Sequence, residues 1–236
     1  MSKETDRYFT DAIMERPYGF SVDDVRFYIY PTTLGKSLLL QRLISSLGIN
    51  NDHLMVNASA EMLRVIGEHR GTCLRIIAYA TCKGKDEVFD EDYVKHRIAI
   101  LENGADNEDI VTLLLVILTG DKVEEVIKEF EIDKEADMLR SCMKVKDSSG
   151  TLSFGGKSIY GTTIDVLCQR YGWTLDYVVW GISYANIRLL LADYIKEVHL
   201  TDEERKRLPA NVLHKDEEVI MATKENMEQI RSMTWR

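Results

Sequence analysis

Two short stretches of the chain end in the same way as a phosphate-binding P-loop. They are Gly35-Lys36-Ser37 and Gly156-Lys157-Ser158. A P-loop needs another glycine five positions before its second one, so that the backbone N–H groups can turn inward around a phosphate. Tyr30 and Thr151 occupy those positions, and Gly150 is one residue out of register. The spacing therefore argues against an ATP or GTP site at either stretch.

Other residue types that support catalysis are present, but not at the spacing that the chemistry requires. No two histidines are spaced to place both on one helix face as metal ligands. Acidic clusters such as residues 87–92 are typical of solvated surfaces and helix N-termini. The chain has no Gly-x-Ser-x-Gly motif, and its four cysteines form no Cys-x-x-Cys pair. We therefore predict reduced cysteines, no metal, no cofactor and no enzyme activity.

Aromatic side chains are concentrated between residues 171 and 184. Thr174 can cap a helix on which Tyr177, Trp180 and Tyr184 recur at spacings of three and four residues, so that the three rings share one face. These rings can form the core of a small domain, which must bury its large side chains. They can also form a docking surface, because Trp and Tyr are enriched in interface hot spots. Both interpretations stay open, and the residues predicted to bind a partner here are Trp173, Tyr177, Trp180 and Tyr184.

A β-hairpin is predicted near the N-terminus. Phe20 and Val22 on one side of Asp23-Asp24, and residues 25–29 on the other, alternate between apolar and polar positions. An open strand edge can pair with another chain, so the edge around Phe27 and Ile29 is predicted to contact a client or a second copy.

Helical periodicity covers most of the remaining sequence. Thr32 or Thr33 can cap a helix that Gly48 ends, and Gly67 and Gly71 can bend the helical segment that begins near residue 58. Residues 106–118 are too apolar for an exposed helix, which predicts the central helix of a bundle. The predicted fold is mainly α, with an N-terminal hairpin plus helical domain at 1–145, a linker at 146–158, a small aromatic-rich helical domain at 159–200 and a charged helical tail at 201–236.

Charge and hydropathy narrow the classes of function. The net charge is −9, from 39 acidic and 30 basic residues, which opposes general binding to a phosphate backbone. The apolar stretches are shorter than the roughly 20 residues that a membrane span needs, and the first residues do not resemble a signal peptide. We expect a cytoplasmic protein without membrane contact. A regulator that binds nucleic acid or a nucleotide stays open as an alternative, and its basic patch would consist of Arg64, His69, Arg70, Arg75, Lys83 and Lys85.

Two motifs and their order resemble a known family. The segment Phe27-Tyr28-Ile29-Tyr30-Pro31 leads into Thr33-Leu34-Gly35, and Tyr171-Gly172-Trp173-Thr174 is followed by Tyr177-x-x-Trp180. With a Gly/Ser linker between two helical parts, this order resembles the tail assembly chaperones encoded by tailed bacteriophages and prophages.

The resemblance implies a function without chemistry. A chaperone of this family would shield the tape measure protein through its N-terminal domain and recruit tail tube subunits through its C-terminal extension. The alternative within the same setting is a helical structural or adaptor subunit of a phage or phage-tail-like particle. A chaperone would be absent from the finished particle, whereas a structural subunit would remain in it.

Overall fold

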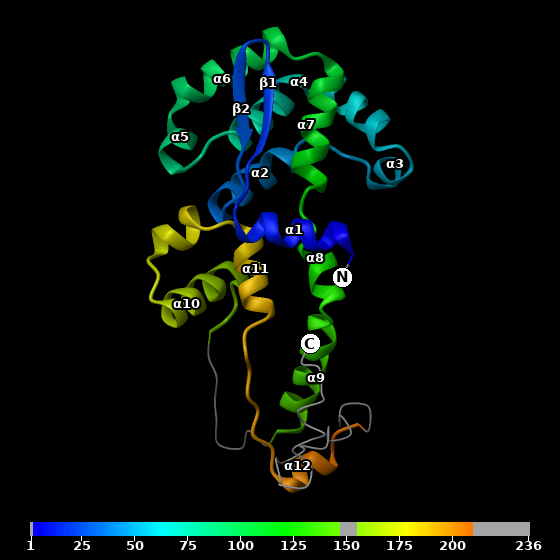
Figure 1. Ribbon diagram of the computed structural model, residues 1–236, viewed down its shortest axis with the longest axis vertical. Helices are drawn as coiled ribbons and strands as arrows, with labels where there is room; N and C mark the ends of the chain where they lie inside the picture. Colours follow the sequence, from blue (N-terminus) through cyan, green and yellow to red (C-terminus); the bar gives the residue numbers. More distant parts are fainter. Residues whose placement is uncertain (1, 147–154, 210–236) are drawn as a thin grey trace, which may run out of the picture. The chain divides into compact units, whose positions relative to one another are not determined.

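The computed structural model describes residues 2–146 and 155–209. These residues are mainly helical, with one two-stranded antiparallel hairpin near the N-terminus, which confirms the predicted fold class (Figure 1). They divide into two compact units, one formed by residues 2–133 with 155–194 and the other by residues 134–146 with 195–209. Within the described residues, no helix is both long enough and apolar enough to span a membrane.

The first unit contains the hairpin and most of the helices. Its strands are β1 (Tyr18–Val22) and β2 (Val25–Ile29). Its helices are α1 (Lys3–Ile13), α2 (Leu34–Ser45), α3 (Asn51–Val56), α4 (Ala58–Ala80), α5 (Lys85–Phe89), α6 (Glu91–Gly104), α7 (Asn107–Thr119), α8 (Val123–Glu129), α10 (Ile159–Tyr171) and α11 (Tyr184–Ala192). A π-helical turn, η1 (Tyr177–Gly181), precedes α11. Helix α9 (Ile132–Val145) begins in this unit and continues into the second, which also contains α12 (Asp202–Lys206).

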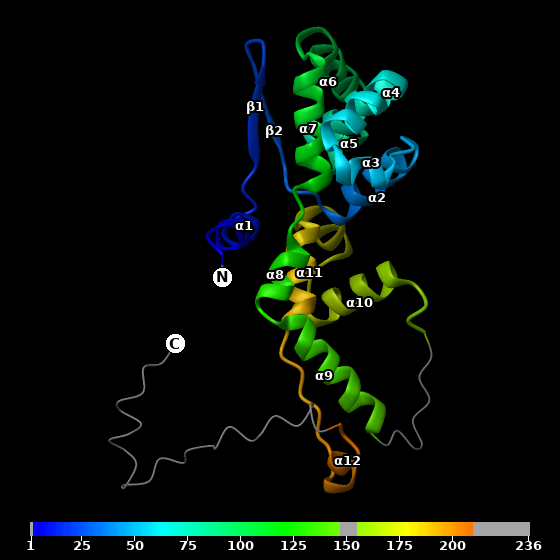
Figure 2. The same cartoon turned by 90° about the vertical axis from the view of Figure 1, so that its right-hand side faces the viewer.

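The hairpin turns at Asp23-Asp24, as predicted. Its register pairs Val22 with Val25 and Phe20 with Phe27, and the rings of Phe20 and Phe27 are stacked with centroids 5.3 Å apart. Because side chains alternate between the two faces of a strand, both rings lie on the same face of the hairpin. That face packs against the helical core, and Figure 2 shows the hairpin beside α7.

Local capping signals define several helix boundaries. The side chain of Thr33 accepts a hydrogen bond from the Lys36 N–H and begins α2. Asp90 caps α6, and Asp106 forms a capping box with Asp109 at the start of α7. Helix α4 is kinked at His69, where the backbone leaves the helical region. The kink lies between the two glycines that were predicted to bend this segment.

Three apolar clusters hold the first unit together. The largest packs α4 against α7, α6 and the hairpin, with Ile110 and Leu114 of α7 fully buried. Helix α4, which contacts α2, α3, α6 and α7, is the centre of the bundle, so the prediction that α7 is the central helix is wrong. A second cluster includes Leu34, Val178 and Ile187. A third joins α1, α8 and α11.

The observed units differ from the predicted domains, because residues 159–194 fold together with residues 2–133. Leu34 of α2 is part of the second cluster, while Trp180 of η1 packs against the largest one. Each segment therefore packs a side chain against the core of the other, and the two segments form one unit. Residues 147–154 of the predicted linker and residues 210–236 of the predicted tail lie outside the described residues.

Candidate functional site

The first P-loop-like stretch is occupied by contacts within the chain. Gly35 lies directly under the ring of Trp180: a Cβ atom at this glycine would be 2.7 Å from the indole. The Lys36 side chain is only 1% exposed, and its Nζ donates hydrogen bonds to the carbonyl oxygens of Cys82, at 2.9 Å, and Tyr30, at 3.5 Å. Burial lowers the pKa of Lys36 to about 8. Because the glycine is covered and the lysine points into the core, this stretch does not present a phosphate site.

The second P-loop-like stretch begins a helix. The Ser158 side chain accepts a hydrogen bond from the Gly161 N–H at 3.2 Å and caps α10. Gly155 and Gly156 both have positive φ angles, of 102° and 68°. The positive φ angles account for the two glycines, and the cap of α10 accounts for the serine.

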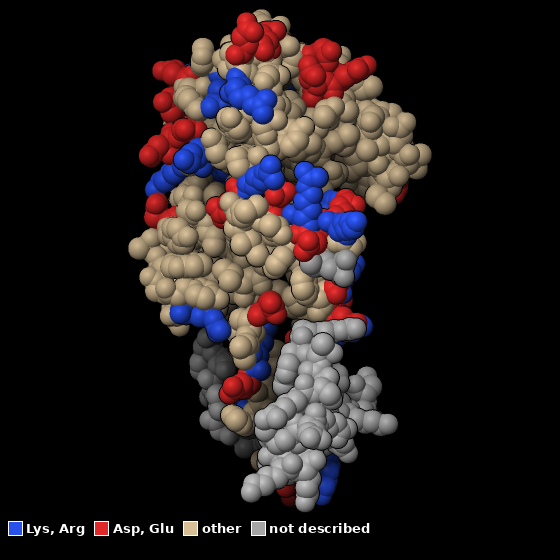
Figure 3. Space-filling model, in the orientation of Figure 1, with Lys and Arg blue, Asp and Glu red and all other residues tan. Residues whose placement is uncertain are grey.

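We use the name aromatic row for four residues: Phe89, Tyr171, Trp173 and Tyr177. Trp173 stacks on Tyr171 with centroids 4.7 Å apart and meets Tyr177 edge to face at 5.2 Å. Phe89 contacts Trp180 edge to face at 5.6 Å, and Trp180 lies in the same π-helical turn as Tyr177. Phe89 is 65% exposed and Tyr177 is 43% exposed. The part of the first unit that contains α10, at the left of Figure 3, shows mostly uncharged side chains.

The predicted common face of Tyr177, Trp180 and Tyr184 is absent, because the predicted helix is interrupted. Ile182 has an extended backbone, and Ser183 caps a new helix, α11, by accepting from the Asn186 N–H at 3.2 Å. Tyr184 therefore lies on a different helix from Tyr177. Ring contacts join Trp173 to Tyr177, whereas Trp180 contacts Phe89 and Tyr184 begins α11.

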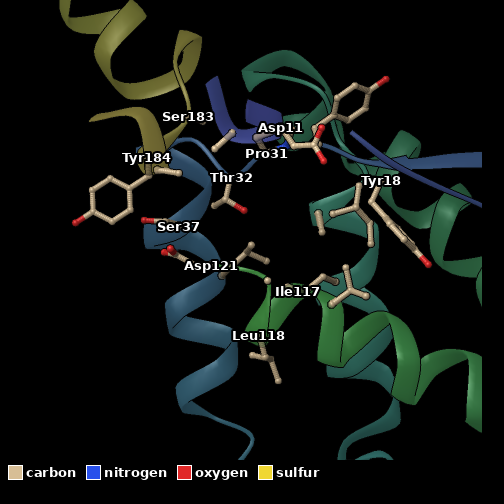
Figure 4. A pocket seen from close by; sticks show the side chains of 18 of the residues that line it. Asp11, Tyr18, Pro31, Thr32, Ser37, Ile117, Leu118, Asp121, Ser183 and Tyr184 are labelled. Carbon is tan, nitrogen blue, oxygen red and sulfur yellow. The ribbon is translucent and has the colours of Figure 1, made fainter. Parts of the chain in front are cut away.

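A cleft of about 510 Å³ opens in the first unit, and Tyr184 is part of its lining. We call it the α2–α7 cleft, after the helices that form two of its walls. Figure 4 shows Ser37 of α2, Ile117 of α7 and Tyr18 of β1 on different sides of the space. Its wall on α2 carries the polar Ser37, Gln41 and Ser45, which recur every four residues along one helix face, together with the apolar Leu40 and Ile44.

The opposite wall is apolar and comes from the C-terminal end of α7. Residues 115–118 are Leu, Val, Ile and Leu, and all four are only partly buried. The core covers the first half of this helix and leaves the last turn open to the cleft. The apolar run was recognised in the sequence, but periodicity alone does not show which half of it stays uncovered.

The two hairpin residues predicted to contact a partner have different environments. Ile29 is half-buried and lines the cleft. Phe27 is 2% exposed and lies beneath the guanidinium of Arg97, which is 5.3 Å from its ring centroid. The side chain of Phe27 is thus part of the core and is not available to a partner in this structure.

The proposed basic patch is largely paired with acidic side chains. Arg64 forms ion pairs with Glu61 at 2.6 Å and Glu68 at 2.7 Å. Arg70 lies 3.5 Å from Glu102, and Lys85 lies 3.0 Å from Asp176. On the face seen in Figure 3, Lys and Arg also lie among Asp and Glu.

The pairing of Glu61 is reflected in its acidity. The Arg64 guanidinium, together with the Asn50 N–H, lowers the pKa of the buried Glu61 carboxyl to about 2.

Within residues 2–146 and 155–209, no group of three or more His, Cys, Asp or Glu side chains is arranged to hold a metal ion.

Comparisons with protein-family models, with curated proteins and with solved structures found no match for this chain. The α2–α7 cleft and the aromatic row are the two surfaces from which a function can be inferred.

Proposed function

We propose that this protein works by binding apolar segments of other proteins and not by catalysis. The observation that carries the proposal is the α2–α7 cleft, where the last turn of α7 stays partly exposed. Exposed apolar surface of this kind is a common feature of binding grooves, and the volume lies within the usual range for binding pockets. Burying the aliphatic wall against a partner would remove that surface from water, which favours association.

The occupant that fits the cleft is an amphipathic helix of a client protein. One wall offers aliphatic side chains at residues 116–118, and the other offers Leu40 and Ile44 beside the uncharged Ser37, Gln41 and Ser45. Amphipathic helices dock in grooves through their apolar face. The aliphatic residues of both walls suit that face, and Ser37, Gln41 and Ser45 can bond to polar residues at its edge.

The aromatic row supplies a second and separate surface. Two surfaces on one unit suit a tail assembly chaperone, the family that the sequence resembles. In that assignment the cleft shields a helical part of the tape measure protein, and the row contacts the tail tube subunit. The protein belongs in the host cytoplasm during assembly in this proposal.

The test is affinity purification of the tagged full-length chain from its native host or from phage-infected cells, with mass spectrometry of the bound proteins. Ile117→Gln changes the apolar wall of the cleft and is expected to abolish recovery of the tape measure protein. Leu63→Gln is the matched control, because Leu63 is 47% exposed on α4 and does not line the cleft. Tyr177→Ala is expected to reduce recovery of the tail tube protein alone.

The structural-subunit alternative is tested in the same preparation. Purified mature particles that contain this chain would favour a permanent subunit over a chaperone. Recovery of no tail protein by the unchanged chain, or equal recovery with Ile117→Gln, would contradict the proposed use of the cleft.

A further inference from the structure

We infer that Gly35 and Trp180 are positioning residues, which hold the aromatic row in the arrangement that a partner recognises. This inference depends on the proposed function of the row as a binding surface. It also assigns a role to Gly35-Lys36-Ser37, a motif that the cleft and the row do not explain.

The contact between Gly35 and Trp180 requires glycine. A Cβ atom at position 35 would lie 2.7 Å from two carbon atoms of the indole ring, closer than side chains normally approach. The contact lies in the first turn of α2, where the ring rests on the helix. The edge-to-face contact with Phe89 places a second ring against the same indole. Trp180 is therefore fixed between α2 and the end of α5.

A second glycine fixes Tyr177 relative to Trp180. A Cβ atom at Gly181 would lie 2.3 Å from the Tyr177 ring, so this ring lies against the backbone of η1. Tyr177 and Trp180 belong to the same π-helical turn, a rare geometry that is often found at functional sites. A shift of Trp180 on α2 would consequently move Tyr177 and, through the edge-to-face contact, Trp173.

Backbone contacts hold both ends of this segment to the same region. The Tyr184 N–H donates to the Thr32 carbonyl oxygen at 2.7 Å, next to an antiparallel bridge between Thr33 and Ser183. On the other side, the Lys85–Asp176 ion pair joins α5 to the residue before η1. The start of α2 therefore determines where η1 lies, and Gly35 lies at the centre of that contact.

The experiment compares Gly35→Ala with Gly67→Ala in the full-length protein. Both changes add one methyl group within a helix, but a Cβ at Gly67 would meet nothing within 4 Å. The first readout is the set of indole N–H resonances in ¹H–¹⁵N NMR spectra, assigned by tryptophan substitution. Gly35→Ala is expected to shift the Trp180 and Trp173 resonances, and Gly67→Ala is expected to leave both in place.

A second substitution tests whether Gly35 acts through the indole. Trp180→Leu removes the ring that the new methyl group would meet, so adding Gly35→Ala to Trp180→Leu should cause no further shift of the Trp173 resonance. An unchanged Trp173 resonance in Gly35→Ala, or the same shift in both backgrounds, would overturn the inference. If the Gly35→Ala protein does not fold, Trp180→Leu is compared with the double variant that also carries Gly35→Ala. The same Trp173 resonance in both supports the inference, and a shifted resonance overturns it.

The final readout is affinity for purified tail tube protein. Gly35→Ala is expected to weaken binding at least about tenfold, as the loss of one interface hot spot does, and Gly67→Ala is expected to have no effect. Unchanged affinity in Gly35→Ala, with shifted resonances, would overturn the positioning role. If tail tube protein does not bind even the unchanged chain, the proposed partner is wrong, and the NMR comparison still decides whether Gly35 positions the row.

Discussion

Replacing Lys36 with methionine should remove a specific pH dependence from the stability of the protein. The folded-state pKa of Lys36 is about 8, below the ordinary lysine value of 10.5, because the side chain is buried. Between these pH values the unfolded chain binds more protons than the folded one, so stability rises as the pH increases. The difference of about 2.5 pH units corresponds to about 3 kcal/mol that the lysine costs near neutral pH and no longer costs above pH 10.5.

Methionine keeps most of the apolar stem but cannot donate to the carbonyl oxygens of Cys82 and Tyr30. Each lost hydrogen bond costs about 1 kcal/mol, which partly offsets the gain at neutral pH. The decisive quantity is therefore the difference in unfolding free energy between the two proteins as a function of pH. Burial raises the pKa of the Cys73 and Cys82 thiols to about 11, but these groups are present in both proteins.

The assay is urea denaturation of the unchanged protein and of Lys36→Met at several values between pH 7 and pH 10. The unchanged protein should gain stability relative to the variant by about 2.5 kcal/mol across that interval, most of it above pH 8, because the rest of the difference is reached only beyond pH 10. Lys95→Met is the control, because this lysine is on the surface, with a side chain 67% exposed. Parallel stability curves for the unchanged protein and Lys36→Met would refute the reasoning.

Three further substitutions test the packing and charge arguments. Leu114→Ala, at a fully buried position in the largest cluster, should lower the free energy of unfolding by about 2–5 kcal/mol in urea denaturation, and a smaller loss would mean that Leu114 is not packed in the core. Gly67→Ala should raise the free energy of unfolding by up to about 1 kcal/mol, because alanine favours the helix and its methyl group meets nothing; a decrease would contradict the open environment at this position. Glu61→Gln should destabilise the protein at neutral pH, because the lowered pKa means that folding favours the charged carboxylate. That difference should shrink in thermal denaturation as the pH falls from 4.5 towards 2, and a difference independent of pH would argue against the Glu61–Arg64 pair.

Signals that act over a few residues were readable in the sequence. Asp23-Asp24 predicted the hairpin turn, and Thr33 was one of two predicted caps for the following helix. Each of these depends on a hydrogen bond or a turn within four residues along the chain. Tertiary packing rarely changes such local preferences when they are strong.

The common face of Tyr177, Trp180 and Tyr184 is a wrong prediction, because the apolar periodicity continues through the break between η1 and α11. The extended backbone at Ile182 is next to a bridge from Ser183 to Thr33, two residues 150 positions apart in the sequence. Local signals for a break are present, since Gly181 can end a helix and Ser183 is a favourable helix cap. Periodicity alone does not detect such a break.

The sequence predicts the environment of Phe27 but not that of Lys36. Alternation within the hairpin already placed Phe27 on the same face as Phe20, and that face faces the core. The burial of Lys36 could not be read from the sequence, because lysine is almost never fully buried. It follows from the position of Cys82 just beyond the end of α4, where a helix terminus favours a positive charge.

The start of α2 shows why a motif can look functional when its residues are used in packing. Gly35 receives the Trp180 ring, the Lys36 amine satisfies two carbonyl oxygens, and the Ser37 hydroxyl donates to the Leu34 carbonyl oxygen at 3.1 Å. A P-loop uses the same residue types at a helix N-terminus because a phosphate needs close backbone approach, a cation and a hydroxyl. Here the chain itself supplies the atoms that those groups contact. Binding to another molecule must then use what packing leaves free, which on α2 includes Gln41 and Ser45 in the cleft wall.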